Sequence, residues 1–440
     1  MSPLETGLAG FAALTLLIYA GMHISTALLL VSFVGISLIR GDWALAGQML
    51  GQTATDAVTE YEFGTAPLFV LMGFMVMAAG IGRDSYIVAE RMFGRFRGGI
   101  GQATVVGNAV FSAVTGVSIA AVVMFTRMAV PEMLRRGYPH KLAVGVVAGS
   151  AMLGMLIPPS VLMIIYAVIT ETSIGDMYTA GIVPGIILSV AFMATIWVVA
   201  GKHPGMAAAA EAVRRESGDL THGSLLRMIF PIVLLVVLVL GGMYAGLFTA
   251  TEAGAVGAAG ATLIALARRA LTPRSFWQIL IDTGYVTASI VLIIASAALF
   301  TRFLAISGLP SYLSQWIATH QFSLLSVMLV YIAIVLVLGT ALDSVSTILI
   351  AVPVFAPVFK DLGADLVWVG IITMITVEVG IITPPLGISP FIVKSTLDAD
   401  GMGQKIPLSD IYRGALPFAA AALVVVGLIV AWPPLALWFK

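Results

Sequence analysis

The chain of 440 residues contains no cysteine and few charged residues. The absence of cysteine excludes disulfide frameworks, thiolate zinc sites and iron–sulfur clusters. Charged residues make up only 10% of the chain, against about 25% in an average soluble domain, so a water-soluble globular protein is excluded. Lys and Arg total 22, and Asp and Glu total 22. This neutral balance argues against a nucleic-acid partner, which calls for a basic excess.

Long apolar stretches dominate what is present. Apolar residues make up 60% of the chain, and a helix that crosses a bilayer needs about 20 mostly apolar residues. Twelve stretches are candidates, at residues 4–20, 22–39, 63–81, 100–134, 141–170, 179–201, 227–248, 249–267, 277–304, 321–359, 366–393 and 415–438. They predict an all-α polytopic membrane protein.

Stretches 100–134 and 321–359 are too long for one crossing, and small polar residues interrupt both. These interruptions are the first tip, residues 112–118, and the second tip, residues 339–346. Each stretch is either two ordinary helices joined by a tight turn or a re-entrant hairpin that stops inside the membrane. The internal repeat described below favours hairpins, which leaves about ten crossing spans.

Basic residues predict the orientation of these spans, because Lys and Arg concentrate in cytoplasmic loops. With the N-terminus outside, 18 of the 22 basic residues fall in the inside segments 82–98, 127–141, 202–227, 268–276 and 394–414. The opposite orientation leaves only four of them inside. We therefore expect a periplasmic N-terminus.

The chain resembles itself at an ungapped shift of 226 residues. The shift pairs Ser118 with Ser344, Pro131 with Pro357, Gly137 with Gly363, and Gly154-x-x-x-Pro158-Pro159 with Gly380-x-x-x-Pro384-Pro385. Asp176-x-Tyr178 is similarly repeated as Asp410-x-Tyr412. Five crossings separate the two hairpins, and because five is odd the two halves lie upside down relative to each other. Inverted repeats of this kind are typical of secondary transporters.

The Pro-Pro pairs predict two broken helices. Residues 154–160 are the first break and residues 380–387 the second, each within a long apolar stretch. Proline has no N–H and clashes with the carbonyl one turn earlier, so carbonyls in each break lose their helical partners. Either the breaks are passive kinks, or their carbonyls coordinate a cation with help from the negative end of the preceding half-helix. The presence of a break in both repeats favours cation binding.

Each tip and the break of the same repeat predict one cation site, because hard cations such as Na⁺ prefer the oxygen ligands that both supply. The alternative for any one hydroxyl is that it caps a short helix. The first predicted site contains Ser112, Thr115, Gly116, Ser118, Gly154, Ile157 and Pro158. The second contains Gly339, Thr340, Asp343, Ser344, Gly380, Thr383 and Pro384. The residues expected to face a substrate are Thr115, Ser118, Ser160, Ser344, Ser346 and Gly387.

Charged residues within the apolar stretches are functional candidates, because the membrane disfavours them. Asp343 lies at the second tip, and we expect it to ligate a cation. Glu378 would ligate a cation, carry a coupling proton or pair with a neighbouring hydroxyl, and the sequence leaves these three open. Glu252 suits the first turn of a helix. Arg127 and Arg302 suit anchors near span ends, and the alternative for either is to bind a substrate carboxylate.

Motifs of other function classes are absent from the sequence. Without H-E-x-x-H or G-x-S-x-G, the chain offers no sign of an enzyme. No Gly-rich loop ends in Gly-Lys-Ser/Thr, so a nucleotide-driven pump is not indicated. A channel does not need two inverted tip-and-break pairs. A secondary transporter driven by an ion gradient is the class that remains. The paired, oxygen-rich tip-and-break sites predict that the coupling ion is sodium, with two or more ions per substrate.

The sequence also resembles a known family of such transporters. Thr115-Gly116-Val117-Ser118 stands where the large membrane (M) subunit of tripartite ATP-independent periplasmic (TRAP) transporters typically shows Ser-Gly-Ser-Ser, so Thr115 and Val117 replace serines. Further stretches similar to that family are 66–73, 131–138, 154–160, 181–185, 248–253 and 383–387. The resemblance spans essentially the whole chain.

The resemblance implies an elevator-type sodium symporter in a bacterial inner membrane. Scaffold helices are then expected at 1–81, half of a transport domain at 82–201, connecting and scaffold helices at 202–304, and the other half at 305–440. The implied partners are a small four-helix membrane subunit and a periplasmic substrate-binding protein, and the implied substrate is a small organic acid. A stand-alone ion-coupled carboxylate symporter of the divalent anion type is the alternative, and a channel is disfavoured.

Overall fold

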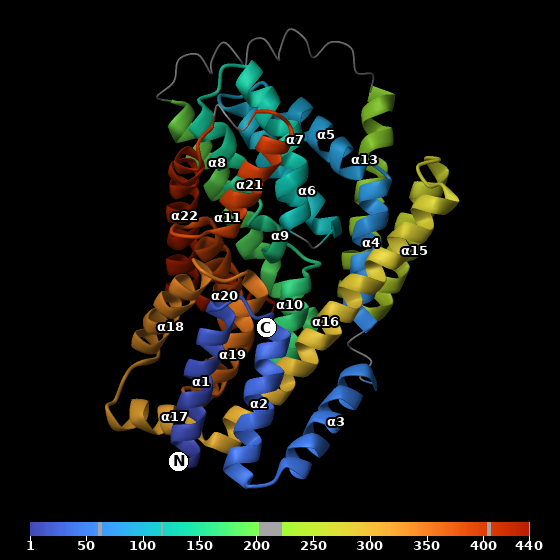
Figure 1. The fold of residues 1–440 in the computed structure, drawn as a ribbon. Helices are drawn as coiled ribbons and strands as arrows, with labels where there is room; N and C mark the ends of the chain where they lie inside the picture. Colours follow the sequence, from blue (N-terminus) through green and yellow to red (C-terminus); the bar gives the residue numbers. More distant parts are fainter. Residues whose placement is uncertain (60–63, 116–117, 202–221, 403–405, 440) are drawn as a thin grey trace.

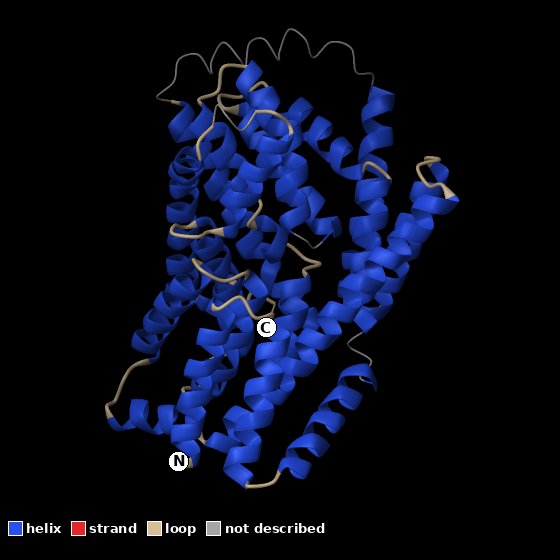
Figure 2. Cartoon of the chain, in the orientation of Figure 1, coloured by secondary structure: helices blue, strands red, loops and turns tan. Residues whose placement is uncertain are grey.

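The computed structural model describes residues 1–59, 64–115, 118–201, 222–402 and 406–439, and these residues form helices and no strands (Figure 2). The helices up to the first long gap are α1 Pro3–Tyr19, α2 Ile24–Arg40, α3 Trp43–Thr59, α4 Thr65–Ala78, α5 Ile81–Phe93, α6 Gly99–Thr115, α7 Ser118–Arg135, α8 His140–Ser150, α9 Leu153–Leu156, α10 Val161–Thr170 and α11 Ile174–Ala200. This confirms the all-α architecture.

The remaining helices form the second half of the chain. They are α13 His222–Val236, η2 Val237–Gly241, α14 Gly242–Tyr244, α15 Ala250–Ala267, α16 Pro273–Ser307, α17 Leu309–Thr319, α18 Leu324–Gly339, α19 Ser344–Asp361, α20 Leu366–Ile382, α21 Ile388–Ala399, α22 Leu408–Ala431 and η4 Pro433–Leu435. Polar side chains cap the N-termini of several of these helices. At the start of α11, for example, the Ser173 side chain accepts a hydrogen bond from the Asp176 N–H. Gly41 and Gly308 end α2 and α16 in the left-handed region that favours glycine.

The expected spans coincide with helices or helix pairs. By length and composition, six of the described helices are suited to crossing a membrane, or eight if each of two bent pairs is one span. The bent pairs are α4 with α5, at 66°, and α8–α9 with α10, at 44°. Helices α1, α2, α18 and α20 are apolar but shorter. The first hairpin is α6 and α7, and the second is α18 and α19, each packed as a pair.

Three helices lie between the expected spans. They are α3, α5 and α17, and none is apolar throughout. Helix α5 buries Ile81, Tyr86 and Ala89 while Arg83 is exposed, so it is amphipathic. A search for continuous apolar runs does not detect such helices, which is why the sequence left these segments as connections.

The two broken helices belong to one packed body. Helix α20 contacts α9, α10, α11, α18 and α22, and α22 also contacts α8 and α11. Gly145 of α8 and Gly414 of α22 let these helices touch, since a Cβ on Gly145 would lie 2.1 Å from the Gly414 carbonyl oxygen. Repeat one and repeat two therefore share a core.

Helix α16 connects this body to the other helices. Its 35 residues span about 52 Å at 1.5 Å per residue, more than the roughly 30 Å hydrocarbon core, so it must be strongly tilted to stay within the bilayer. Figure 1 shows it running diagonally, from the end that carries α5 to the end that carries α3, α17 and the N-terminus. It contacts α1–α4, α10, α17 and α19. The division into scaffold and transport parts stays a prediction.

Candidate functional site

The first tip lies directly against the first break. A Cβ on Gly154 would be 3.1 Å from Ser118 Cα and 3.2 Å from Ser112 Oγ. All three residues are buried. The absence of a side chain on Gly154 thus lets the start of α7 and the end of α6 approach the broken helix, and three predicted ligands of the first site come together. Gly116 lies outside the described residues.

Two buried oxygens beside this contact have no hydrogen-bond partner within the part of the chain that the structure describes. They are Ser112 Oγ and Asn108 Oδ1. Asn108 precedes Ser112 by four residues, so both lie on one face of α6, and the Asn108 amide donates to Ser150 Oγ of α8 at 2.8 Å. Sequence analysis missed Asn108, although an amide within an apolar stretch, one turn before the tip, was a usable signal.

Thr115, a predicted ligand of the first site, and Ser160, predicted to face the substrate, both form local hydrogen bonds. The Thr115 hydroxyl donates to the Phe111 carbonyl at 2.9 Å. The Ser160 hydroxyl donates to the Met155 carbonyl at 2.8 Å and caps α10. Ser160 thus matches the capping alternative, while Thr115 bonds back to the preceding turn of its own helix.

The prolines of the first break determine which of its carbonyls lose their hydrogen-bond donors. Pro158 and Pro159 offer no N–H, so the carbonyls of Gly154 and Met155 lose their helical partners. The Ser160 hydroxyl donates to the Met155 carbonyl. The Ile157 N–H donates to the Leu153 carbonyl at 2.9 Å, and so does not serve the Gly154 carbonyl. The Gly154 carbonyl therefore receives no N–H from its own helix, and the same residue lies against Ser112 of α6.

The second tip and second break also meet, through backbone atoms. A Cβ on Gly380 would lie 2.7 Å from Gly339 Cα. The Gly387 N–H donates to the Thr340 carbonyl at 3.0 Å, and the Thr383 N–H donates to Gly380 at 2.9 Å. The Ile381 carbonyl, four residues before Pro385, loses its helical donor. The peptide bond between the two prolines is cis in both breaks.

The two acids of the second half occupy different positions. Asp343 is exposed and caps α19, accepting hydrogen bonds from the N–H groups of Val345 and Ser346 at 3.2 and 3.3 Å and from the Ser346 hydroxyl. Glu378 is 1% exposed and accepts a hydrogen bond from the Ser344 hydroxyl at 2.9 Å. The tip thus touches a buried carboxylate, and of the three interpretations of Glu378 the structure contains the hydroxyl pairing.

The remaining charged candidates are structural in this arrangement. Glu252 forms a capping box with Thr249 at the start of α15. Arg127 pairs with Asp400 at 3.4 Å, and Arg302 pairs with Asp56 of α3 at 2.9 Å. Neither arginine contacts a tip or a break through these bonds.

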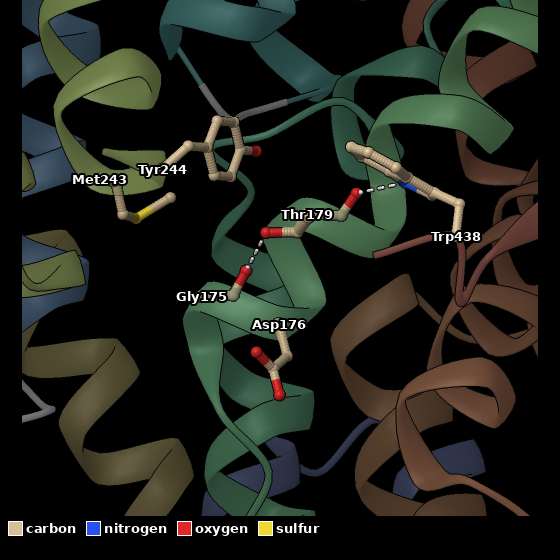
Figure 3. A pocket seen from close by; sticks show the side chains of 6 residues that line it. All are labelled: Gly175, Asp176, Thr179, Met243, Tyr244 and Trp438. Atoms are coloured by element: carbon tan, nitrogen blue, oxygen red, sulfur yellow. Dashed lines mark hydrogen bonds between the residues drawn. The ribbon is translucent and has the colours of Figure 1, made fainter. Parts of the chain in front are cut away.

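A cavity of about 410 Å³ is lined by residues outside both tips and both breaks. It is lined by Gly175, Asp176 and Thr179 of α11, Met243 and Tyr244 of α14, and Trp438 (Figure 3). The Trp438 indole N–H donates to the Thr179 carbonyl at 3.2 Å. No predicted site residue lines it, so it is separate from the tip-and-break contacts.

Comparisons with known proteins give the family. Residues 11–435 match the family model of the tripartite ATP-independent periplasmic transporter, DctM component. The C4-dicarboxylate TRAP transporter large permease protein DctM of Pseudomonas aeruginosa is 34% identical over 83% of this chain and 82% of its own length. The sialic acid TRAP transporter large permease protein SiaM of Vibrio cholerae is 29% identical, over 95% and 94%.

A solved structure shares the fold. MtrF of Neisseria gonorrhoeae, described as an antimetabolite efflux pump, superposes with a TM-score of 0.62 and 12% identity, covering 90% of this chain and 85% of MtrF. This likeness is one of fold.

Proposed function

The chain belongs to the family of DctM components, the large permease subunits of TRAP transporters, and from this premise we propose that it imports a small organic acid together with sodium ions. As a member it is a multi-pass transport protein of the inner membrane. Sodium coupling, the acid substrate and the elevator motion are the proposed parts.

The contact of the first tip with the first break carries the sodium proposal. Ser112 Oγ and Asn108 Oδ1 are buried and unpartnered within the described part of the chain. Gly154, which lies against Ser112, has a carbonyl that has lost its helical donor. An unpartnered buried oxygen costs about 1–3 kcal/mol. A hard cation bound there would remove that cost, since sodium takes neutral oxygen ligands.

The second tip and break supply a second site in this proposal. Gly339, Thr340 and Gly380 hold tip and break together, and the Ile381 carbonyl is free of a helical donor. Asp343 adds negative charge nearby. One site in each repeat gives at least two sodium ions per transport cycle.

An acid substrate fits the relatives and the tips. The named relatives carry a C4-dicarboxylate and sialic acid, both carboxylates. Helices α7 and α19 begin at the two tips, and a helix start favours negative charge. Asp343 already occupies the start of α19, so we propose that the substrate carboxylate binds nearer to Ser118 at the start of α7.

Inverted repeats give this site access to either side of the membrane. In the proposed cycle the body that holds both tips and both breaks moves against α16 and the other scaffold helices. A periplasmic substrate-binding protein delivers the acid, and a small four-helix membrane subunit stabilises the scaffold.

Uptake into vesicles tests the function. The permease is reconstituted with the small subunit, and uptake of radiolabelled C4-dicarboxylate and sialic acid is measured after an inward sodium gradient is imposed, each with its binding protein. We expect uptake with sodium and none with choline. Uptake with choline driven by a proton gradient would overturn sodium coupling, and uptake without any binding protein would support a stand-alone symporter.

Single cysteines test the orientation, and the cysteine-free chain makes this direct. Arg269 lies between α15 and α16, Gln321 lies between α17 and α18, and both are exposed. The two test variants are Arg269→Cys and Gln321→Cys. We expect an impermeant maleimide to label position 321 but not 269 in spheroplasts of intact inner membrane. The reverse pattern would place the N-terminus in the cytoplasm.

A further inference from the structure

The repeated Asp-x-Tyr motifs have a structural role that the proposed function does not yet use. Tyr178 lies in the second turn of α11 and Tyr412 in the second turn of α22. Each of these helices follows the broken helix of its own repeat. The motifs therefore place a tyrosine at equivalent positions after the two breaks.

Each tyrosine hydroxyl donates to a carbonyl directly after a Pro-Pro pair. Tyr412 donates to the Leu386 carbonyl oxygen at 2.8 Å and lies 3.4 Å from that of Pro385. Tyr178 donates to the Ser160 carbonyl oxygen at 3.5 Å. Ser160 and Leu386 are related by the same shift of 226 residues that relates the Pro-Pro pairs. The two bonds are thus counterparts of each other.

The two carbonyls depend on these bonds to different degrees. Ser160 caps α10, and its carbonyl also accepts from the Ile164 N–H at 3.2 Å. Leu386 precedes Gly387, the N-cap of α21, so its carbonyl lies outside the helix. Tyr412 also packs on Gly387, whose added Cβ would be 3.1 Å from the Tyr412 ring. The second break therefore relies on its tyrosine more than the first.

The surroundings of the two tyrosines differ in the same direction. Tyr178 is fully buried and meets Phe69 of α4 edge to face, with ring centroids 5.9 Å apart, so packing holds it and the first break together. Tyr412 is only partly buried, and Leu386 is 49% exposed. Packing therefore stabilises the second break less than the first, and the Tyr412 hydrogen bond contributes a larger share of that stabilisation.

We propose that Tyr178 and Tyr412 are paired positioning residues that hold the chain after each Pro-Pro pair, and so fix the direction of the carbonyls before it. The inference rests on the proposed sodium function. The carbonyls of Ser160 and Leu386, which follow the prolines, accept hydrogen bonds from the two tyrosines. We therefore assign the cation ligands to the carbonyls of Gly154 and Ile381, which precede the prolines. The tyrosines themselves touch neither ion nor substrate.

Tyr412→Phe and Tyr178→Phe remove only a hydroxyl. Tyr166→Phe is the matched control, because the buried Tyr166 hydroxyl also donates to a backbone carbonyl, that of Leu366 at 2.7 Å, away from either break. Sodium dependence of uptake is measured in vesicles that contain the small subunit, with binding protein added, and thermal unfolding is measured on the same preparations.

We expect Tyr412→Phe to raise the sodium concentration at half-maximal uptake about fivefold, as loss of one hydrogen bond predicts, and Tyr178→Phe about twofold. Tyr166→Phe should leave that midpoint unchanged. Tyr412→His retains a ring donor and should recover part of the loss, whereas Tyr412→Leu should not. Maximal uptake at saturating sodium should stay within about twofold in both Phe variants.

Two results would overturn the inference. One is an unshifted sodium midpoint in Tyr412→Phe when the unaltered protein shows sodium-driven uptake. The other is an equal shift in Tyr166→Phe, which would mark a general effect of lost hydroxyls. If Tyr412→Phe does not assemble, the same midpoints in Tyr412→His and Tyr412→Leu decide, and equal midpoints in these two would overturn the inference. Sodium-independent uptake by the unaltered protein overturns the proposed function instead, and the inference with it.

Discussion

The two tip-and-break halves share one backbone arrangement but differ in charge and in how deeply their residues are buried. In the first half, Pro158, Pro159 and Ser160 are buried, and the tip sequence contains no carboxylate. In the second, the stretch from Pro384 to Leu386 is exposed, and Asp343 and Glu378 lie at or beside the tip. The shift of 226 residues pairs Glu378 with Met152.

The comparison separates what a broken helix requires from what one site adds. Both halves keep a glycine where tip and break touch, and both keep Pro-Pro, because backbone approach and freed carbonyls depend on them. The acids occur in one half. We infer that the first half binds its cation with neutral oxygens alone, while the second adds the exposed carboxylate of Asp343.

The largest expected effect comes from filling the contact between tip and break. Gly380→Ala places a Cβ 2.7 Å from backbone Cα of Gly339, which no side-chain rotation relieves. We expect a loss of about 1–3 kcal/mol in the free energy of unfolding, together with loss of uptake. Gly154→Ala meets Ser118 at 3.1 Å and should cost less.

Gly427→Ala is the control for this pair, because nothing lies within 4 Å of its added Cβ. Thermal unfolding in detergent and vesicle uptake are the measurements. If Gly380→Ala unfolds at the same temperature as Gly427→Ala, the contact of α18 with α20 is looser than the structure has it.

The next effect tests whether charge distinguishes the two halves. Asparagine caps helices about as well as aspartate, so Asp343→Asn should leave the unfolding temperature of the protein unchanged. If Asp343 also helps to bind a cation, the sodium midpoint of uptake should rise about tenfold, or about 1.4 kcal/mol. Ser118→Ala in the first half should shift it less. An unchanged midpoint in Asp343→Asn would make this residue a helix cap alone.

A smaller and more diagnostic effect concerns the first half. Ser112→Ala removes a buried hydroxyl without a partner in the described chain, so the sodium-free protein should gain up to about 1–3 kcal/mol of stability. The same change should raise the sodium midpoint by about threefold, because one neutral ligand is lost.

Thr126→Val is the control, because Thr126 Oγ1 is likewise buried and unpartnered among the described residues but is not a predicted ligand. It should gain stability without moving the midpoint. Equal midpoints for Ser112→Ala and the unaltered protein would remove Ser112 from the site.

The smallest effect is expected at Glu378. Glu378→Gln retains an oxygen that accepts the hydrogen bond from Ser344, now 2.9 Å, so sodium-driven uptake should stay within about twofold of the unaltered protein. Uptake rates from pH 6 to pH 9 would be compared for both proteins. Loss of the pH dependence in Glu378→Gln would make this carboxylate a coupling proton carrier.

Sequence patterns sufficed where a local rule decides the structure. Pro158-Pro159 and Pro384-Pro385 end helices wherever they occur, and small polar tips interrupt long apolar runs. The repeat then paired each tip with the right break. The amphipathic helices α3, α5 and α17 were not predicted, because their apolar residues line one face and form no continuous run.

Individual side-chain roles were harder to predict. Thr115 was predicted to ligate a cation and to face the substrate, and Ser160 to face the substrate, yet each hydroxyl donates to a nearby carbonyl. Asn108 was passed over, since the importance of its oxygen depends on how α6 faces α8. Hydroxyl and amide groups choose among neighbours a few ångströms apart, and those neighbours come from other helices.

The sequence by itself therefore determined the class of protein, the spans, the two hairpins, the two breaks and their inverted relation. Each of these follows from apolar length, proline chemistry or a repeated spacing within one segment. Only the tertiary structure decided that Gly154 touches Ser118 and Ser112, that Ser344 binds Glu378, and that the two tyrosines bind counterpart carbonyls. Those contacts join segments up to tens of residues apart, and the packing of whole helices sets their distances.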